Sequence, residues 1–444
     1  MINFPQSLLN QLKKLPHFDE NAFLEAHAAE RLVTSIRLNP FKPAKLDFEL
    51  SNPVPWNQHA YYLNERPYFT HDPMFHAGAY YVQEAGSMFI EQALSQSLNL
   101  TDDLKILDLC AAPGGKSTLI NTLISKNSLL VANEIVKSRA DVLAQNLSRW
   151  GTSNTVVTNN HPDKFMVLKD YFDAIVVDAP CSGSGLFRKQ PEAINEWSEQ
   201  AVAACELRQK NILENILPTL KNDGILVYST CSYSIEENEN IVNWLISEQG
   251  MTYVPIKINA EWGIQENAQG YRFYPHLAMS EGFFCAVLRR ENVQNKHTKT
   301  HKFKSNISKQ EIDVTHEFID SSYLTLNKIN GRIHLMNQEG FDFLNQHEKK
   351  FYYKKAGTLI GEIKNGKLVP EQELAWCTAL NNNINRIDLE KEEAIQFLKK
   401  ENFQHKSNLQ GLVLFSYKNL GLAWAKILSN RVNNYLPNEI KILR

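Results

Sequence analysis

Short apolar runs and amphipathic stretches alternate between residues 76 and 290. Apolar runs predict buried strands at 105–109, 129–134, 155–158, 172–178, 224–229 and 283–288. Amphipathic stretches predict helices that begin at Ser117 and helices over 136–150, 197–221 and 236–249. Strands that alternate with helices are typical of an α/β fold with a doubly wound, mainly parallel sheet. Because ligands bind beyond the carboxyl ends of such strands, the loops after the first, second, fourth and fifth strands are the candidate sites.

The segments on either side of this region have other patterns. Residues 1–75 form an N-terminal extension with helices predicted near 5–15 and 21–33, a strand at 35–40 and irregular structure over 45–75. Residues 291–311 are polar and basic and have few large aliphatic side chains, which is typical of a linker. Short strand-like runs after this linker predict two small α+β modules, over 312–380 and 381–444.

Composition and charge narrow the class of protein. The 444 residues are 43% hydrophobic, enough for several domains with buried cores. No apolar run reaches the roughly 18 residues that span a bilayer, and no signal peptide follows Met1, so we expect a cytoplasmic monomer with no membrane partner. The net charge is −2, but residues 291–444 hold 23 Lys and Arg against 17 Asp and Glu. The net charge of +6 in this part, against −8 in residues 1–290, predicts a module that binds a polyanion.

The loop after the first strand has the composition of a nucleotide or nucleoside site. Paired glycines let the backbone approach a ligand, and the following helix offers free N–H groups; the loop residues are Cys110, Ala111, Ala112, Pro113, Gly114, Gly115 and Lys116. Gly115-Lys116-Ser117 is similar to the end of a phosphate-binding P-loop, but that loop needs glycine where Cys110 stands. A P-loop-like nucleotide-binding module is therefore the alternative, and S-adenosylmethionine is the favoured ligand. Glu134, at the end of the second strand, is placed to accept hydrogen bonds from a ribose.

Two of the six cysteines follow strand ends at the predicted ligand edge. Cys181 lies in Asp178-Ala-Pro-Cys and Cys231 lies in Thr-Cys-Ser. No C-x-x-C pair occurs, so we expect no metal site. Methylation of cytosine at C5 requires such a thiol, because a thiolate that adds to C6 makes C5 nucleophilic. Asp178 is placed to contact N3 of the base, and a second cysteine would assist product release.

The residues themselves leave the order of the two cysteines open. Nearby positive charge favours a thiolate, and Arg188 and Lys189 are candidates to supply it. Cytosine-5 DNA methyltransferases attack with the Pro-Cys cysteine and carry Glu-Asn-Val soon after it. Here Glu291-Asn292-Val293 lies 110 residues beyond Cys181, and we interpret the triplet as a coincidence.

Five motifs of the chain resemble those of the RNA cytosine-5 methyltransferases of the NOL1/NOP2/Sun family. They lie at 35–40, 75–84, 108–118, 178–183 and 230–232. The resemblance implies a Rossmann-like sheet that binds S-adenosylmethionine through residues 110–116. It also implies that Cys231 is the nucleophile and that Cys181 assists release. Glu134 would bind the ribose, Asp163 would lie on the adenine side, and Asp178 would be the active-site acid.

The end of the chain resembles the PUA-like tail of the ribosomal RNA branch of that family. The residues concerned lie at 411–415, 420–426 and 434–437. This resemblance implies 16S ribosomal RNA as the substrate, and transfer RNA is the alternative with the same chemistry. Phosphate contacts from the basic C-terminal part would position such an RNA without reading its sequence.

Overall fold

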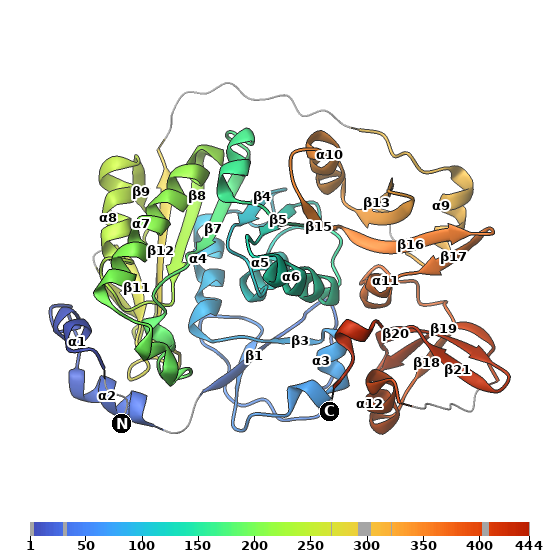
Figure 1. Cartoon of the computed structure of the whole chain (residues 1–444), viewed down its shortest axis with the longest axis horizontal. Helices are drawn as coiled ribbons and strands as arrows, with labels where there is room; N and C mark the ends of the chain where they lie inside the picture. The colour runs from blue at the N-terminus through green and yellow to red at the C-terminus, as the bar shows by residue number, and fades with distance from the viewer. Residues whose placement is uncertain are drawn as a thin grey trace.

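The computed structural model describes residues 4–29, 33–267, 269–291, 303–320, 322–401 and 408–443. A large central sheet is accompanied by an N-terminal part and by two small C-terminal sheets (Figure 1), and the N-terminal part shares a core with the last of these sheets. The strand order of the central sheet is β10-β11-β12-β8-β7-β4-β5-β6-β15, and β9 pairs with β12. Its strands are β4 (Lys105–Asp108), β5 (Leu129–Asn133), β6 (Thr155–Thr158), β7 (Phe172–Asp178), β8 (Leu220–Thr230), β9 (Met251–Tyr253), β10 (Gln265–Asn267), β11 (Gly270–Phe273), β12 (Phe283–Arg290) and β15 (Tyr353–Ala356).

The strands at the centre of this sheet are parallel, which confirms the predicted α/β class. β8, β7, β4, β5 and β6 run parallel to one another, whereas β12 pairs antiparallel with β8 and β15 pairs antiparallel with β6. The complete sheet is therefore mixed, because antiparallel strands extend both edges of the parallel centre.

Helices cover both faces of the sheet, and this explains why its central strands are apolar throughout. Side chains of α4 (Ile90–Ser97) and α5 (Gly115–Leu123) share one core with alternate residues of the strands. Side chains of α7 (Glu199–Ile216) and α8 (Glu239–Glu248) share a second core with the residues between them. A strand buried on both faces needs apolar residues at successive positions, as in parallel α/β sheets generally. α6 (Lys137–Trp150) packs through Leu143 and Leu147 against Ala111 and Ala112, which follow β4, and against Ala132 of β5 and Val157 of β6.

The N-terminal part contains more regular structure than its pattern predicts. α1 (Gln6–Leu12) and α2 (Glu20–Ala28) are followed by a three-stranded sheet of order β2-β1-β3. Its strands are β1 (Thr34–Leu38), β2 (Ala60–Leu63) and β3 (Tyr80–Val82). The prediction of irregular structure over 45–75 is wrong at β2 and at α3 (Pro73–Ala77), both too short to show a clear period.

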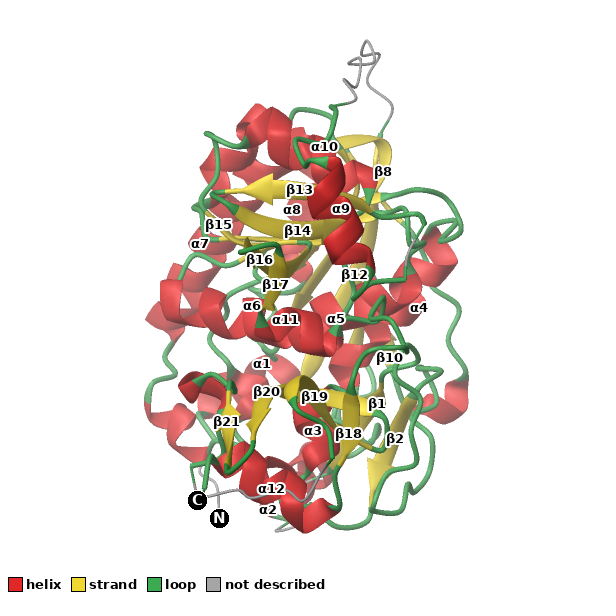
Figure 2. Ribbon diagram, turned by 90° about the vertical axis from the view of Figure 1, so that its right-hand side faces the viewer, coloured by secondary structure: helices red, strands yellow, loops and turns green. Residues whose placement is uncertain are grey.

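The C-terminal part consists of two sheets, one on each side of α11 (Gln372–Trp376), which packs against both (Figure 2). The first has the order β13-β14-β16-β17 and the second has the order β18-β19-β20-β21. Their strands are β13 (Thr325–Ile329), β14 (Arg332–Met336), β16 (Thr358–Lys364), β17 (Lys367–Pro370), β18 (Arg386–Asp388), β19 (Gly411–Tyr417), β20 (Leu420–Leu428) and β21 (Arg431–Asn434), with helices α9 (Lys309–His316), α10 (Gln338–His347) and α12 (Lys391–Lys399).

The predicted linker lies largely outside the described residues, since 292–302 are not described. The domain boundaries stay predictions, although two strands pair across them: β3 with β1, and β15 with β6. Of the helices in the described part of the chain, none combines the length and apolar character that a bilayer crossing requires.

Candidate active site

The glycine-rich loop lies between the end of β4 and the start of α5, as predicted. Its backbone is held from both sides: Ala111 N–H donates to Asn133 O at 2.9 Å, and Asn146 Nδ2 donates to Pro113 O at 2.8 Å. Gly114 has a φ of 111°, a left-handed conformation that favours glycine. The loop therefore turns sharply into the N-terminus of α5, where a ligand meets free N–H groups.

An acid at the start of this loop has an unused hydrogen-bonding atom. Asp108 is fully buried at the end of β4, and its Oδ2 accepts a 2.6 Å hydrogen bond from Ser117 Oγ. Its Oδ1 is buried without a hydrogen-bond partner among the described residues. Burial raises the pKa of Asp108 to about 7. A ligand that brings a cationic donor, such as the amino-acid end of S-adenosylmethionine, would satisfy this oxygen.

Lys116 leaves the cofactor loop and reaches the end of β7. Its Nζ lies 2.8 Å from Asp178 Oδ2, and only 13% of the side chain is exposed. Burial opposes the charge of this lysine, but the carboxylates of Asp178 and Asp108 outweigh burial, so its pKa is raised. Cys231 lies within the electrostatic reach of the same ammonium group. Lys116 is thus the cation of the active site.

Glu134 and Asp163 lie beyond the ends of β5 and β6, but their surroundings differ. Glu134 is buried; Val136 N–H donates to its Oε1 at 3.0 Å and the Arg139 guanidinium lies 3.6 Å from its Oε2. Asp163 has a half-exposed side chain whose Oδ1 lies 3.1 Å from His161 Nδ1. The structure therefore places Glu134 in a fixed position beside the cofactor loop and Asp163 at the outer rim.

The two predicted cysteines meet at the edge of the sheet. Asp178 of β7 pairs with Ser229 of β8, and each strand continues into a loop that carries a cysteine two or three residues later. Cys181 Sγ and Cys231 Sγ lie 3.1 Å apart. Both are free thiols, and both are partly accessible. Parallel pairing of neighbouring strands thus brings together two side chains that are 50 residues apart in the sequence.

The contact between the sulfur atoms distinguishes the two thiols. The hydrogen bond with Cys231, together with burial, raises the pKa of the Cys181 thiol. At this distance either thiol can donate its S–H to the other sulfur when that sulfur carries the negative charge. Ser229 Oγ donates to Asp178 Oδ1 at 2.9 Å, which fixes the acid beside the same pair.

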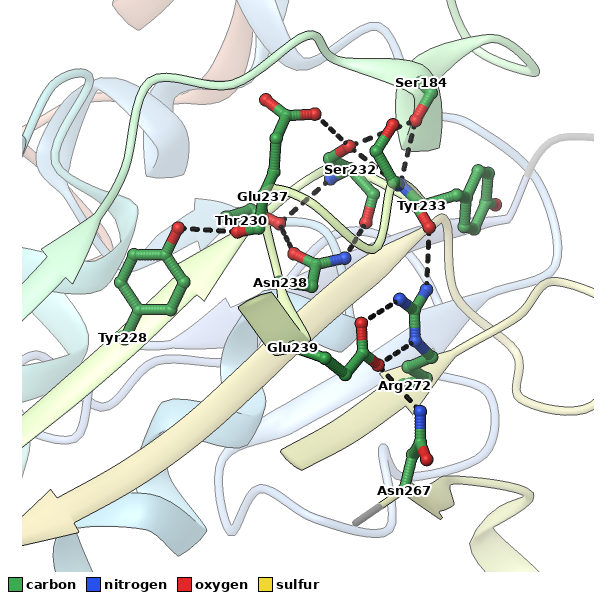
Figure 3. A network of polar contacts seen from close by, with 11 residues as sticks. Ser184, Tyr228, Thr230, Ser232, Tyr233, Glu237, Asn238, Glu239, Asn267 and Arg272 are labelled. Carbon is green, nitrogen blue, oxygen red and sulfur yellow. Dashed lines mark hydrogen bonds and ion pairs between the residues drawn. The ribbon is translucent and has the colours of Figure 1, made fainter. Parts of the chain in front are cut away.

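A buried carboxylate, that of Glu237, connects the two cysteine loops, and Figure 3 shows its contact with Ser232. Glu237 accepts hydrogen bonds from Ser182 N at 2.7 Å, from Ser182 Oγ at 2.6 Å and from Ser232 Oγ at 2.6 Å. Each serine directly follows one of the two cysteines. Glu237 is fully buried, so it sets the separation of the two thiols through their neighbours.

Further contacts fix the backbone around Cys231. Gly185 N–H donates to Cys231 O at 2.8 Å, and a Cβ on Gly185 would come within 2.7 Å of that oxygen. Below the loop, Arg272 forms a two-pronged ion pair with Glu239 and donates to Tyr233 O at 2.9 Å (Figure 3). Glycine is therefore required at 185, and the loop is held on both sides.

The structure contradicts the predicted roles of Arg188 and Lys189. Arg188 is buried, and its guanidinium forms an ion pair with Glu281 at 2.8 Å, so its charge is already compensated. Lys189 is exposed, and its ammonium group makes no ion pair with any described residue. Lys116 supplies the positive charge that was attributed to this pair; the prediction was wrong because proximity in the chain was taken for proximity in space.

Sequence reasoning missed Glu237 and the two serines that it binds. Glu237 lies in a run of charged residues that predicts only the exposed start of a helix. The structure places the first turn of that helix at Glu239 and directs Glu237 inward. The one available signal was the Cys-Ser dipeptide that occurs in both loops.

Family models match three segments of the chain. Residues 95–289 match the model of 16S rRNA methyltransferase RsmB/F. Residues 4–85 match the N-terminal domain of 16S rRNA methyltransferase RsmF, and residues 384–442 match the methyltransferase RsmF PUA domain. The first C-terminal sheet lies between two of these matches.

Similar proteins match along nearly the whole chain. The ribosomal RNA small subunit methyltransferase F of Shewanella woodyi is 30% identical, with 99% of this chain and 97% of the relative covered. The protein of the same name from Vibrio atlanticus is 29% identical over 99% of this chain and 98% of its own length. A methyltransferase homologue from Pyrococcus horikoshii, a solved structure, is 27% identical with a TM-score of 0.56, covering 65% of this chain and 96% of its own. The solved structure of NSun6 from the same organism, determined with SFG, is 22% identical and has a TM-score of 0.55. The match covers 66% of this chain and 100% of that chain, and it shows a shared fold.

Proposed function

Because this chain belongs to the family of the ribosomal RNA small subunit methyltransferases F, we propose that it methylates C5 of a cytosine in 16S ribosomal RNA through a covalent bond to Cys231. The enzymes of this family use S-adenosylmethionine. One observation supports the proposed chemistry above all: two free thiols lie 3.1 Å apart beside an acid that is paired with a lysine of the cofactor loop. A single thiol would serve for attack alone, whereas a pair serves attack and release.

The residues around the cofactor loop fit S-adenosylmethionine. The unpartnered Asp108 oxygen, the left-handed Gly114 and the buried Glu134 offer an acceptor for the amino group, a close approach of the backbone and a ribose acceptor. Bound there, S-adenosylmethionine supplies an electrophilic methyl group. We assign residues 110–116, Glu134 and Asp178 to its binding site, with Asp163 on the outer, adenine side.

The first step is the attack of the Cys231 thiolate on C6 of the cytosine. The new C6–S bond forms as the electron pair of the C5–C6 double bond moves toward C5 and N3. N3 takes up a proton from solvent as the charge develops there, and the Asp178 carboxylate, which Lys116 holds in place through their 2.8 Å ion pair, accepts the N3–H hydrogen bond. C5 would then take the methyl group, whose bond to the sulfonium sulfur would break with its electron pair left on that sulfur.

Release reverses the addition. The C5 proton passes to solvent water, the electron pair of the C5–H bond forms the C5–C6 double bond again, and the C6–S bond breaks with its electron pair on the Cys231 sulfur. Cys181 donates its S–H to that departing sulfur at the observed 3.1 Å, which stabilises the thiolate as it leaves. The order of roles is the one that the resemblance to the NOL1/NOP2/Sun family implies, and the raised pKa of the Cys181 thiol agrees with it, because that thiol then keeps a proton to donate.

The substrate assignment rests on the family and on the C-terminal part. We propose that the PUA-like sheet, β18 to β21, binds RNA, and that the target cytosine enters the site unpaired or flipped out of a helix. We also propose that the protein acts in the cytoplasm as a single copy. We propose that the chain is organised as the five predicted segments: 1–75, 76–290, 291–311, 312–380 and 381–444.

Transfer of a labelled methyl group from S-adenosylmethionine to unmodified 16S ribosomal RNA tests the proposal, with nucleoside analysis of the product. The expected product is 5-methylcytidine at one site. Cys377→Ala is the matched control, because Cys377 is a buried free thiol in the C-terminal part, away from the pair. A methylated product other than 5-methylcytidine, or full turnover by Cys231→Ala, would contradict the proposal.

A further inference from the structure

A second pocket lies behind the cofactor loop, between the N-terminal sheet and α6. It has a volume of about 280 Å³, close to the lower end of pockets that hold small ligands. Its principal lining residues are Arg66, Phe69, Phe75, Tyr81, Asn146 and Arg149. None of these residues takes part in the proposed chemistry at the cysteines, so the pocket needs another explanation.

The two arginines of this pocket carry charge that the protein does not compensate. Neither guanidinium forms an ion pair with a described residue, and no acidic side chain lines the pocket. Arg149 lies 5.0 Å above the Phe75 ring, and its Nε is buried without a hydrogen-bond partner among the described residues. Burial lowers the pKa of Arg149 to about 10, although the nearby Tyr81 opposes this effect. Such a guanidinium needs an anionic partner, and Arg66 stands exposed at the mouth, 5.3 Å from the Phe69 ring.

The remaining lining residues are typical of a site for a nucleotide. Phe75 and Tyr81 are half-buried, so part of each ring is accessible to a planar ligand. Unpaired bases stack on aromatic side chains, and arginines bind the phosphates beside them. Asn146 is an amide that both donates and accepts, and its Nδ2 also holds Pro113 O of the cofactor loop. The pocket is therefore joined to the cofactor loop through Asn146, and none of residues 110–116 is among the residues that line it.

We propose that this pocket binds one unpaired nucleotide of the RNA substrate outside the target cytosine. Its phosphate would contact Arg66 and Arg149, and its base would lie against Phe75 and Tyr81. The inference rests on the proposed function, since it takes RNA as the substrate. It adds a subsite that anchors the RNA on the N-terminal part while the target base occupies the cysteine site.

The test compares Arg66→Ala and Arg149→Met with Arg208→Ala, which removes an exposed guanidinium from α7. We expect KM for a 16S ribosomal RNA fragment to rise about tenfold in each pocket variant but not in the control. The slope of log binding constant against log salt should fall by about 0.7 for each lost phosphate contact. Arg66 is exposed, so its removal does not threaten folding; thermal unfolding checks Arg149→Met.

Photo-cross-linking with an RNA fragment that contains 4-thiouridine gives a direct readout. Peptides that include residues 66–81 should be cross-linked in the wild type and should lose most of the signal in Arg66→Ala. Wild-type KM and salt slope in both pocket variants would overturn the proposal. A weaker Kd for S-adenosylmethionine at unchanged KM for RNA would also overturn it, because the pocket would then only support the cofactor loop. Binding and cross-linking need no methyl transfer, so failure of the proposed function would leave both readouts intact.

Discussion

Replacement of Glu237 by alanine separates the two cysteine loops without touching either thiol. The carboxylate accepts three short hydrogen bonds from Ser182 and Ser232, at 2.6–2.7 Å, in a fully buried position. The two serine hydroxyls lie 3.3 Å apart and can turn toward each other, so the Ser182 N–H is the main group left without a partner. One unsatisfied buried donor costs about 1–3 kcal/mol and each lost charge-assisted bond adds about 1.5 kcal/mol. With the two lost hydroxyl bonds counted at about 1.5 kcal/mol each, the expected loss in the free energy of unfolding is about 4–6 kcal/mol.

The same change should reduce catalysis more than binding. Without Glu237 the two loops are free to move apart, and a misplacement of about 1 Å costs on the order of a hundredfold in rate. We expect kcat to fall about 100-fold, while KM for RNA and Kd for S-adenosylmethionine stay within about threefold. Single-turnover methyl transfer measures the rate, and urea unfolding measures stability under the same conditions.

A graded series makes this prediction refutable. In Glu237→Gln, the amide oxygen keeps the Ser182 N–H bond and the two hydroxyls can accept from the NH₂ group, so the loss should be about 1 kcal/mol. Glu248→Ala, an exposed acid at the end of α8, is the matched control. Loss of stability in Glu237→Ala with unchanged kcat would refute the reasoning, because the carboxylate would then stabilise the fold without positioning the thiols.

Three further variants test other contacts of the site. Gly185→Ala places a Cβ 2.7 Å from Cys231 O and should lower kcat at least tenfold; wild-type kcat would contradict the packing argument. Burial raises the pKa of Asp108 from 3.8 to about 7, so the folded protein holds a proton that the unfolded chain releases. The contribution of Asp108 to the free energy of unfolding should therefore fall as the pH rises from 4 to 7, and Asp108→Asn should make the measured slope shallower in urea titrations without S-adenosylmethionine. Lys116→Met should slow alkylation of Cys231 by iodoacetamide about tenfold, measured by mass spectrometry; an equal rate would exclude Lys116 as the activating cation.

The motifs gave most of the candidate site, because they are local in the sequence and lie at strand ends. The pairing of β7 with β8, seen only in the structure, explains why Cys181 and Cys231 meet, whereas the alternating pattern predicts only that both loops lie at the same edge of the sheet. The contacts of the supporting residues could not be predicted. Glu237 is charged and lies in a polar run, and only the tertiary structure shows that it is buried. Lys116 has its partner on another strand, 62 residues away, which no local pattern reveals.

The fold was predictable where its elements are long and apolar. The prediction of a parallel centre of the sheet was correct, whereas the antiparallel strands at its edges were not predicted. β15 comes from the C-terminal part and joins the sheet beside β6. Pairing between segments that are far apart in the chain produces no repeating pattern of hydrophobic and polar residues, so the sequence does not reveal it. β2 and β3 are three or four residues long, too short for the alternation of a strand to stand out.

The identity of the residue bonded to RNA tests the central claim most directly. Cys181→Ala should accumulate a covalent protein–RNA complex, because the product leaves slowly without its donor to the departing sulfur. Digestion and mass spectrometry should then find 5-methylcytidine attached to the peptide that carries Cys231. An adduct on any other residue, or no adduct in Cys181→Ala while the wild type turns over, would contradict the assignment of attack to Cys231 and release to Cys181.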